Sequence, residues 1–299
     1  MVMLGVLAGL GASFFWALGS MLAHAPARRL GAFEFTRTQL ISASFLLLIL
    51  VTLAGGWRTV AWAHAPGFIA SSVAVIIGNL AMVGCLARGG PRRMQILMAT
   101  SPAIAAVLGY AVLRETMSAR QLGGAFLVLA GVVLAIVYRH GRKQGEGATA
   151  DAVQGPFAVM AAFGIFAATC QAIGLIALKP ALSAGTDPLA ATALRTGGAA
   201  LFIAVLALWP AAAFEPVSPR TGRLVLAAIL PGILGYVVAV SLQLYALRSF
   251  GTGIAAVLGS AAPVMILPML WLASGERPLW PAWIGAAVVL LGASFVVGA

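Results

Sequence analysis

The chain has 299 residues, of which 62% are hydrophobic and only 8% are charged, and its mean hydropathy is +1.05. A soluble domain carries about 25% charged residues, so the composition excludes a water-soluble globular protein and indicates an integral membrane protein. Lipid offers no hydrogen-bond partner to an open backbone, so we expect an almost entirely helical chain. The net charge of +11 comes from basic residues scattered between apolar segments, which excludes the extended basic face of a nucleic-acid-binding protein.

Ten apolar segments, each about as long as a helix needs to cross a bilayer, follow one another along the chain. We expect these spans at residues 3–23, 33–54, 66–86, 93–113, 119–138, 156–178, 188–209, 224–246, 252–273 and 280–298. A long polar stretch, RHGRKQGEGATADAVQG, separates the first five spans from the last five. The sequence therefore predicts a first five-helix unit over residues 1–138, a cytoplasmic linker over 139–155 and a second five-helix unit over 156–299.

The two units contain an internal repeat. A shift of 161 positions superposes five pairs of residues: Gly90 and Gly251, Pro102 and Pro263, Glu115 and Glu276, Gly124 and Gly285, Gly131 and Gly292. An odd number of spans per copy makes the second copy enter the membrane from the opposite face. The predicted fold class is therefore an all-α integral membrane protein, with ten transmembrane helices arranged as two inverted five-helix repeats.

Basic residues between the spans predict the orientation. Eleven fall on one side: Arg28, Arg29, Arg88, Arg92, Arg93, Arg139, Arg142, Lys143, Arg220, Arg223 and Arg277. Five fall on the other: Arg58, Arg114, Arg120, Lys179 and Arg248. The richer side is expected to be cytoplasmic, so both termini are expected outside.

Two further arginines lie within predicted spans, Arg37 early in the second and Arg195 in the first half of the seventh. Glu34 precedes Arg37 by one helical turn and can neutralise it, and Asp187 is placed to cap the seventh span. The two arginines either hold loops and reach toward the interface, or attract an anionic carboxylate. Glu115 and Glu276 lie on turns, where we expect each to cap the next helix or pair with nearby arginines.

The pattern E-x-x-x-x-x-Q-L-G-G…L-x-L-A-G, formed by Glu115, Gln121, Gly123, Gly124 and Gly131, resembles the EamA-type repeat of the drug/metabolite transporter superfamily. The resemblance covers the whole chain, although its second copy is looser because proline and tryptophan follow the second turn glutamate. Within the superfamily the chain looks most like bacterial amino-acid exporters of the YddG type. That resemblance implies export of amino acids, with aromatic ones favoured, across a bacterial inner membrane.

Polar residues within spans are costly in lipid and usually face a cavity or a partner helix. From these residues and the two span prolines we select ten substrate-binding candidates: Trp16, Asn79, Gln95, Ser101, Pro102, Gln171, Tyr236, Gln243, Ser260 and Pro263. For the rings the alternative is packing, and for the amides it is hydrogen bonding between helices. For Pro102 and Pro263 we expect a mid-helix kink that shapes or gates a cavity, with direct substrate contact as the alternative.

All seven acidic residues lie at span ends or in loops, so we expect neither a strongly cationic substrate nor tight proton coupling. Phosphate loops, metal-spaced His/Cys clusters and catalytic Ser/His/Asp sets are missing from the sequence, so we expect no enzyme, cofactor or metal. The sequence predicts an alternating-access, uniport-like exporter of small neutral or zwitterionic metabolites. Its expected partners are that substrate and the bilayer, with a monomer favoured. The alternatives are a carrier for a sugar, nucleoside or drug-like compound, and a membrane subunit that transports nothing.

Overall fold

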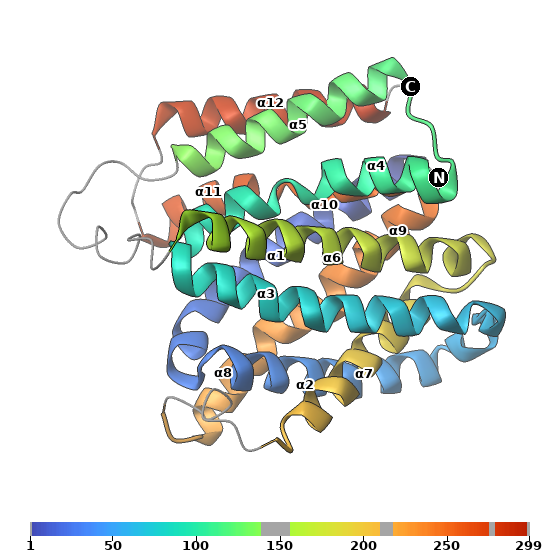
Figure 1. Cartoon of the computed structure of the whole chain (residues 1–299), viewed down its shortest axis with the longest axis vertical. Coiled ribbons are helices and arrows are strands. Elements are labelled where there is room, and N and C mark those ends of the chain that lie inside the picture. The colour runs from blue at the N-terminus through green and yellow to red at the C-terminus, as the bar shows by residue number, and fades with distance from the viewer. Residues whose placement is uncertain (1, 139–155, 210–217, 275–278, 298–299) are drawn as a thin grey trace.

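The structure is a computed structural model that describes residues 2–138, 156–209, 218–274 and 279–297, and these residues form helices joined by short connections (Figure 1). The first half contains α1 Val2–Leu30, α2 Ala32–Leu53, the short 3₁₀ turns η1 Gly56–Thr59 and η2 Trp62–His64, α3 Ala65–Met98, α4 Ser101–Leu113 and α5 Ala119–Val137. The second half contains α6 Phe157–Ser183, α7 Pro188–Leu206, α8 Gly222–Gly232, η4 Ile233–Ala239, α9 Val240–Ser249, α10 Thr252–Gly259, α11 Ala262–Ser274 and α12 Trp280–Val297. The predicted linker over 139–155 lies outside the described residues.

Eight helical stretches of the described chain are long and apolar enough to cross a membrane. They are Met3–Ala23, Phe33–Leu53, Trp62–Met82, Ala119–Val137, Phe157–Ser183, Pro188–Leu206, Gly222–Ser249 and Thr252–Met269. Two apolar helices, Ser101–Leu113 and Trp280–Phe295, are shorter. An all-helical membrane protein is confirmed, whereas helix length does not confirm the predicted count of ten spans.

Two helices run further than their apolar segments. Helix α1 continues through Pro26 to Leu30, where the sequence predicts an end near residue 23. Leu30 is fully buried against Phe35 and Ala228, and this burial favours the extra helical turns. Helix α3 continues to Met98, through the predicted break at residues 87–92, because arginine is a good helix former and does not end a helix as it ends an apolar run.

The helices break instead at two repeat-related places. Residues 99–100 separate α3 from α4, and residues 260–261, which are 161 positions further on, separate α10 from α11. Pro102 and Pro263 therefore lie in the first turn of a new helix, and the predicted mid-helix kink at each is wrong. A proline in the first turn needs no amide hydrogen, so it begins a helix without cost and leaves the preceding segment to end just before it.

The eighth predicted span is also irregular. It was expected as one helix over 224–246, but the seven residues of η4 form a π-helix between α8 and α9. The π-helix begins two residues after Pro231, which removes an amide donor from the helical ladder, and a widened turn is a common response. This widened turn places Gly235 and Tyr236 in the interior of the bundle, where they border the candidate site.

The last helices of the two repeats, α5 and α12, lie side by side (Figure 1). A Cβ atom at Gly131 would lie 2.5 Å from the Gly285 carbonyl oxygen, and one at Gly292 would lie 2.7 Å from that of Gly124. Position 131 thus faces 285 while 124 faces 292, so the two helices run antiparallel. The repeat shift of 161 positions relates Gly131 to Gly292 and Gly124 to Gly285, so each contact is the repeat equivalent of the other. A two-fold axis between the copies requires this equivalence.

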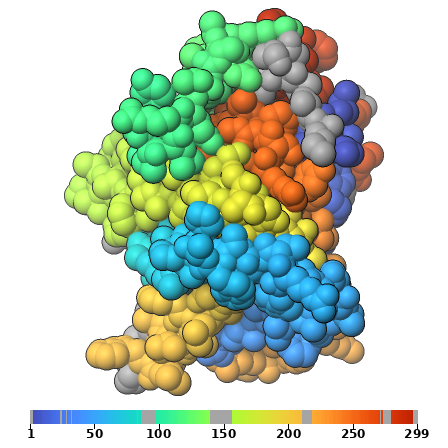
Figure 2. All heavy atoms as spheres, turned by 90° about the vertical axis from the view of Figure 1, so that its right-hand side faces the viewer, coloured from blue at the N-terminus to red at the C-terminus, as the bar shows by residue number. Residues whose placement is uncertain are grey.

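A second antiparallel pair, α3 and α6, joins the repeats near the centre of the bundle. Gly67 lies against Ala177 and Gly84 lies against Phe163, so the sequence positions on the two helices run in opposite directions. At one end of the bundle the α2–α3 connection and the α6–α7 turn also touch, where the Ala61 amide donates to the Thr186 hydroxyl at 3.0 Å (Figure 2). Small residues thus let the helices of the two repeats approach closely.

The α5–α12 contact gives a stability prediction. Gly131→Ala would force a methyl group into the backbone of α12 and should lower the free energy of unfolding by about 1–3 kcal/mol. The measurement is the thermal midpoint of the protein purified in detergent. Gly123→Ala is the matched control, because a Cβ there has nothing within 4 Å. Equal midpoints for the two variants would contradict the observed packing.

Candidate functional site

A polar site lies inside the bundle at the break between α10 and α11. Trp16 of α1 reaches this break from one side and Gln243 of α9 from another. A Cβ atom at Gly259, the last residue of α10, would lie 2.9 Å from Gln243 Nε2 and 3.4 Å from the Trp16 ring. The missing side chain at Gly259 therefore leaves the space in which the two side chains meet the helix end.

The polar atoms around this break are only partly used. Gln243 is 3% exposed, and its Oε1 is buried without a hydrogen-bond partner. Ser260, directly after Gly259, donates its hydroxyl to the Val257 carbonyl at 2.8 Å. The structure thus brings together three of the predicted residues, Trp16, Gln243 and Ser260, and leaves one buried acceptor free.

Two more predicted residues meet on the other side of the π-helix. Asn79 of α3 interacts with Tyr236 of η4. Tyr236 lies deep in the bundle yet is only partly buried. The two groups are adjacent, because Gly235, next to Tyr236, lies against the Trp16 ring.

For the remaining predicted residues whose side chains are described, no contact with these two groups is found. Ser101 and Pro102 are buried at the start of α4, and Pro263 is partly buried at the start of α11. Gln171 is a partly buried residue of α6 whose backbone faces α3. The backbone of Gln95 lies in α3, but its side chain is outside the described part of the chain.

Arg195 of α7 is the main residue that the prediction left out of the site. It is 4% exposed and is close enough to Tyr236 to interact with it electrostatically. The sequence located it within a span but left its role open, because sequence shows neither its burial nor its neighbours. The other charge predictions for these helices are confirmed: Glu34 pairs with Arg37 at 2.9 Å, and Asp187 caps α7 through the amides of residues 189 and 190.

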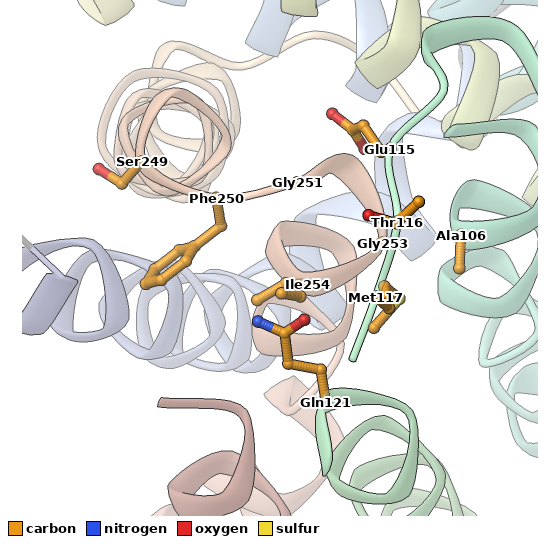
Figure 3. Close-up of a pocket in the computed structure, with 10 residues that line it drawn as sticks. All are labelled: Ala106, Glu115, Thr116, Met117, Gln121, Ser249, Phe250, Gly251, Gly253 and Ile254. Carbon is orange, nitrogen blue, oxygen red and sulfur yellow. The ribbon is translucent and has the colours of Figure 1, made fainter. Parts of the chain in front are cut away.

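A cavity of about 240 Å³ opens at one end of the bundle, around the turn between α9 and α10 (Figure 3). Its lining contains none of the ten predicted residues: it consists of Ala106, Glu115, Thr116, Met117, Gln121, Ser249, Phe250, Gly251, Gly253 and Ile254. The charged group of this cavity is already engaged, since Glu115 Oε2 accepts a hydrogen bond from the Thr252 amide. We therefore assign this cavity a structural role at the helix junction.

Two charges from the first and second repeats hold this junction. Glu115 caps α10, and Lys179 of α6 donates to the carbonyls of Leu247 and Phe250 at the end of α9. One of the two predicted alternatives, that Glu115 caps the next helix along the chain, is wrong. Helix α5 is capped by Ser118 together with Gln121, which form a reciprocal capping box and leave Glu115 free to reach across the bundle.

A second hollow, of about 580 Å³, lies between α3 and α6 and is lined by apolar side chains such as Ile69, Ile77 and Phe166. These three side chains are exposed on the bundle surface. A surface of this composition suits lipid chains better than a polar solute. The polar groups around the π-helix and the α10–α11 break therefore remain the better site for a metabolite.

Comparisons with known proteins address the family and the fold. The sequence model of the EamA-like transporter family matches residues 3–137 and again 158–298. No curated protein matches the chain. A solved structure titled "Crystal structure of protein" is 17% identical, with a TM-score of 0.78 over 97% of this chain and 95% of its own. That likeness shows a shared fold.

The α9–α10 junction gives a second stability prediction. Lys179→Met should lower the thermal midpoint, because two carbonyls at the end of α9 lose their charged donor, at about 1–3 kcal/mol for the pair. Arg248→Met removes an exposed positive charge from the same end of α9 and should leave the midpoint nearly unchanged. The proposed role of Lys179 at this junction is wrong if both variants have the same thermal midpoint as the wild type.

Proposed function

The chain belongs to the EamA-like transporter family, and from this membership we propose that it exports small neutral or zwitterionic metabolites, with amino acids as the substrate class and aromatic ones favoured. Membership itself makes the protein a multi-pass membrane transporter. The substrate class, the direction of transport and a bacterial inner-membrane location, with both termini outside, are the proposal. Its closest physical support comes from the residues at the α10–α11 break.

The observation that carries the proposal is the unpaired Oε1 of Gln243 beside the Trp16 ring. A buried acceptor without a partner costs about 1–3 kcal/mol, and a bound solute that donates a hydrogen bond recovers this cost. The ammonium group of an amino acid is such a donor. Trp16 offers a ring face to the same cation or to an aromatic side chain.

Interrupted helices are a known feature of transporter binding sites, because their ends expose backbone groups without breaking the rest of the fold. Here the interruptions lie at matching places of the two repeats, before Ser101 and before Ala262. We propose that α4 and α11 complete two of ten membrane crossings in an inverted-repeat bundle. The antiparallel contact of α5 with α12 supports this inverted arrangement.

We further propose that the two interrupted helices move alternately to open the site to each side, without proton coupling. The acidic side chain nearest the interior among the described residues is Glu34, which is 4% exposed. It is already held by Arg37 at 2.9 Å and by Arg220 at 3.0 Å. Its carboxylate is thus engaged in two ion pairs, and we propose that it takes no part in transport.

Counterflow with the purified protein in liposomes tests this function. Liposomes preloaded with an amino acid should take up the labelled form of the same compound with equal pH on both sides. Trp16→Ala should reduce the initial rate at least several-fold, because the ring that borders the site is lost. Trp280→Ala is the matched control, since that tryptophan is 77% exposed at the start of α12.

The panel should include sugars and nucleosides beside the amino acids. Exchange of a sugar or nucleoside without amino-acid exchange would contradict the proposed substrate class. If liposomes with the wild-type protein exchange none of the compounds in the panel, the protein is a membrane subunit that transports nothing. A rate that depends on an imposed pH gradient would contradict the uniport mechanism.

A further inference from the structure

Arg195 is a buried guanidinium whose charge has no acidic partner among the described residues. Its side chain lies inside the bundle, and its Nη1 has no hydrogen-bond partner. Both ion pairs found in the described part of the chain involve Glu34, on another helix. An unpaired buried charge is expensive in a membrane protein and marks a functional site more often than a structural one.

In the other repeat, the arginine at the equivalent position has an acidic partner. Arg37 lies 158 positions before Arg195, and its partner Glu34 lies one helical turn before it. The same shift carries Glu34 onto Thr192, whose hydroxyl donates to the Pro188 carbonyl at 2.7 Å. The second repeat therefore keeps the arginine and lacks the acid that would pair with it.

Small groups border the Arg195 guanidinium. A Cβ atom at Gly174 would lie 3.4 Å from Arg195 Nη2 and 3.5 Å from the Ser71 hydroxyl, so the glycine lets the guanidinium lie close to the backbone of α6. Tyr236 is close enough to interact electrostatically with the same charge, and it is only partly buried. A guanidinium, a phenol and the Asn79 amide together form a set of donors suited to a carboxylate.

We propose that Arg195, with Tyr236 and Asn79, binds the carboxylate of the transported solute. The inference rests on the proposed function and narrows it: the substrate must carry a carboxylate. The π-helix connects the two ends of such a solute, because Tyr236 interacts electrostatically with Arg195 while the adjacent Gly235 lies against Trp16. The solute's acid group binds at Arg195, and its remaining part extends toward Trp16 and Gln243.

Acid–amide pairs test the site directly by binding. The purified wild-type protein is melted in detergent with phenylalanine, leucine or alanine, and with phenylalaninamide, leucinamide or alaninamide. At least one acid should raise the thermal midpoint, whereas its amide should not. In Arg195→Gln the acid should bind about 10–100-fold more weakly, which corresponds to the loss of one charge-assisted contact. Equal shifts from acid and amide, or an unchanged affinity in the variant, would overturn the proposal.

A charge graft gives an independent test that does not remove the arginine. Thr192→Glu places an acid one turn before Arg195, as Glu34 precedes Arg37, and should occupy the guanidinium and abolish the shift caused by the acid. Thr192→Gln has the same size without the charge and should keep that shift. If neither Thr192 variant folds, Arg195→Lys provides the test, because it retains the positive charge and should bind the acid more tightly than Arg195→Gln does. Tighter binding of the acid by Arg195→Gln than by Arg195→Lys would contradict the proposed site.

The two proposals fail separately. Acid-specific binding that depends on Arg195, without counterflow of any amino acid, leaves the carboxylate site standing and removes the transport proposal. Amino-acid counterflow that is equally fast in Arg195→Gln leaves transport standing and removes the site. Both measurements use the full chain, and the melting curve of each variant without ligand shows whether it is folded.

Discussion

The close approach of helices through small residues is the constraint on which the rest of this structure depends. Lipid tails are as apolar as leucine, so burial of apolar side chains does not hold membrane helices together, and close backbone packing has to. The paired glycines of α5 and α12 provide that packing twice, once at Gly131 with Gly285 and once at Gly124 with Gly292. Because the two contacts are equivalent, the pair fixes the two repeats in opposite directions.

This packing allows other helices to be interrupted. Helix ends leave backbone donors and acceptors without partners, and those groups must be satisfied by side chains when water is absent. At the α9–α10 junction Lys179 and Glu115 do this with opposite charges, each suited to the helix end it meets. At the α10–α11 break Ser260 satisfies one carbonyl, but Gln243 Oε1 stays unpaired. The polar groups of the first junction are paired within the protein, whereas the second keeps an unpaired acceptor.

The sequence predicted the helical fold and the repeat because both follow from apolar segment length and from residue identity. The predicted helix ends were wrong, because hydrophobicity indicates where a chain segment leaves the lipid. The helical hydrogen bonds can continue beyond that point, as they do in α3, which extends to Met98. The sequence found Trp16 and Gln243 as polar residues inside spans. It could not give the role of Arg195, because a charge within a span reads the same whether or not a partner acid lies beside it.

The two repeats have similar backbones but differ in their charged residues. This difference in charge allows a symmetric scaffold to bind a ligand that is not symmetric. A two-fold bundle with Glu34 and Arg37 in both copies would place an acid beside each of the two arginines. Replacing the acid by Thr192 in one copy leaves a single fixed cation beside the π-helix. The repeat supplies the packing that keeps this cation buried. Because the second copy lacks the carboxylate, the guanidinium is left unpaired, and in the proposed site it pairs with the carboxylate of the solute.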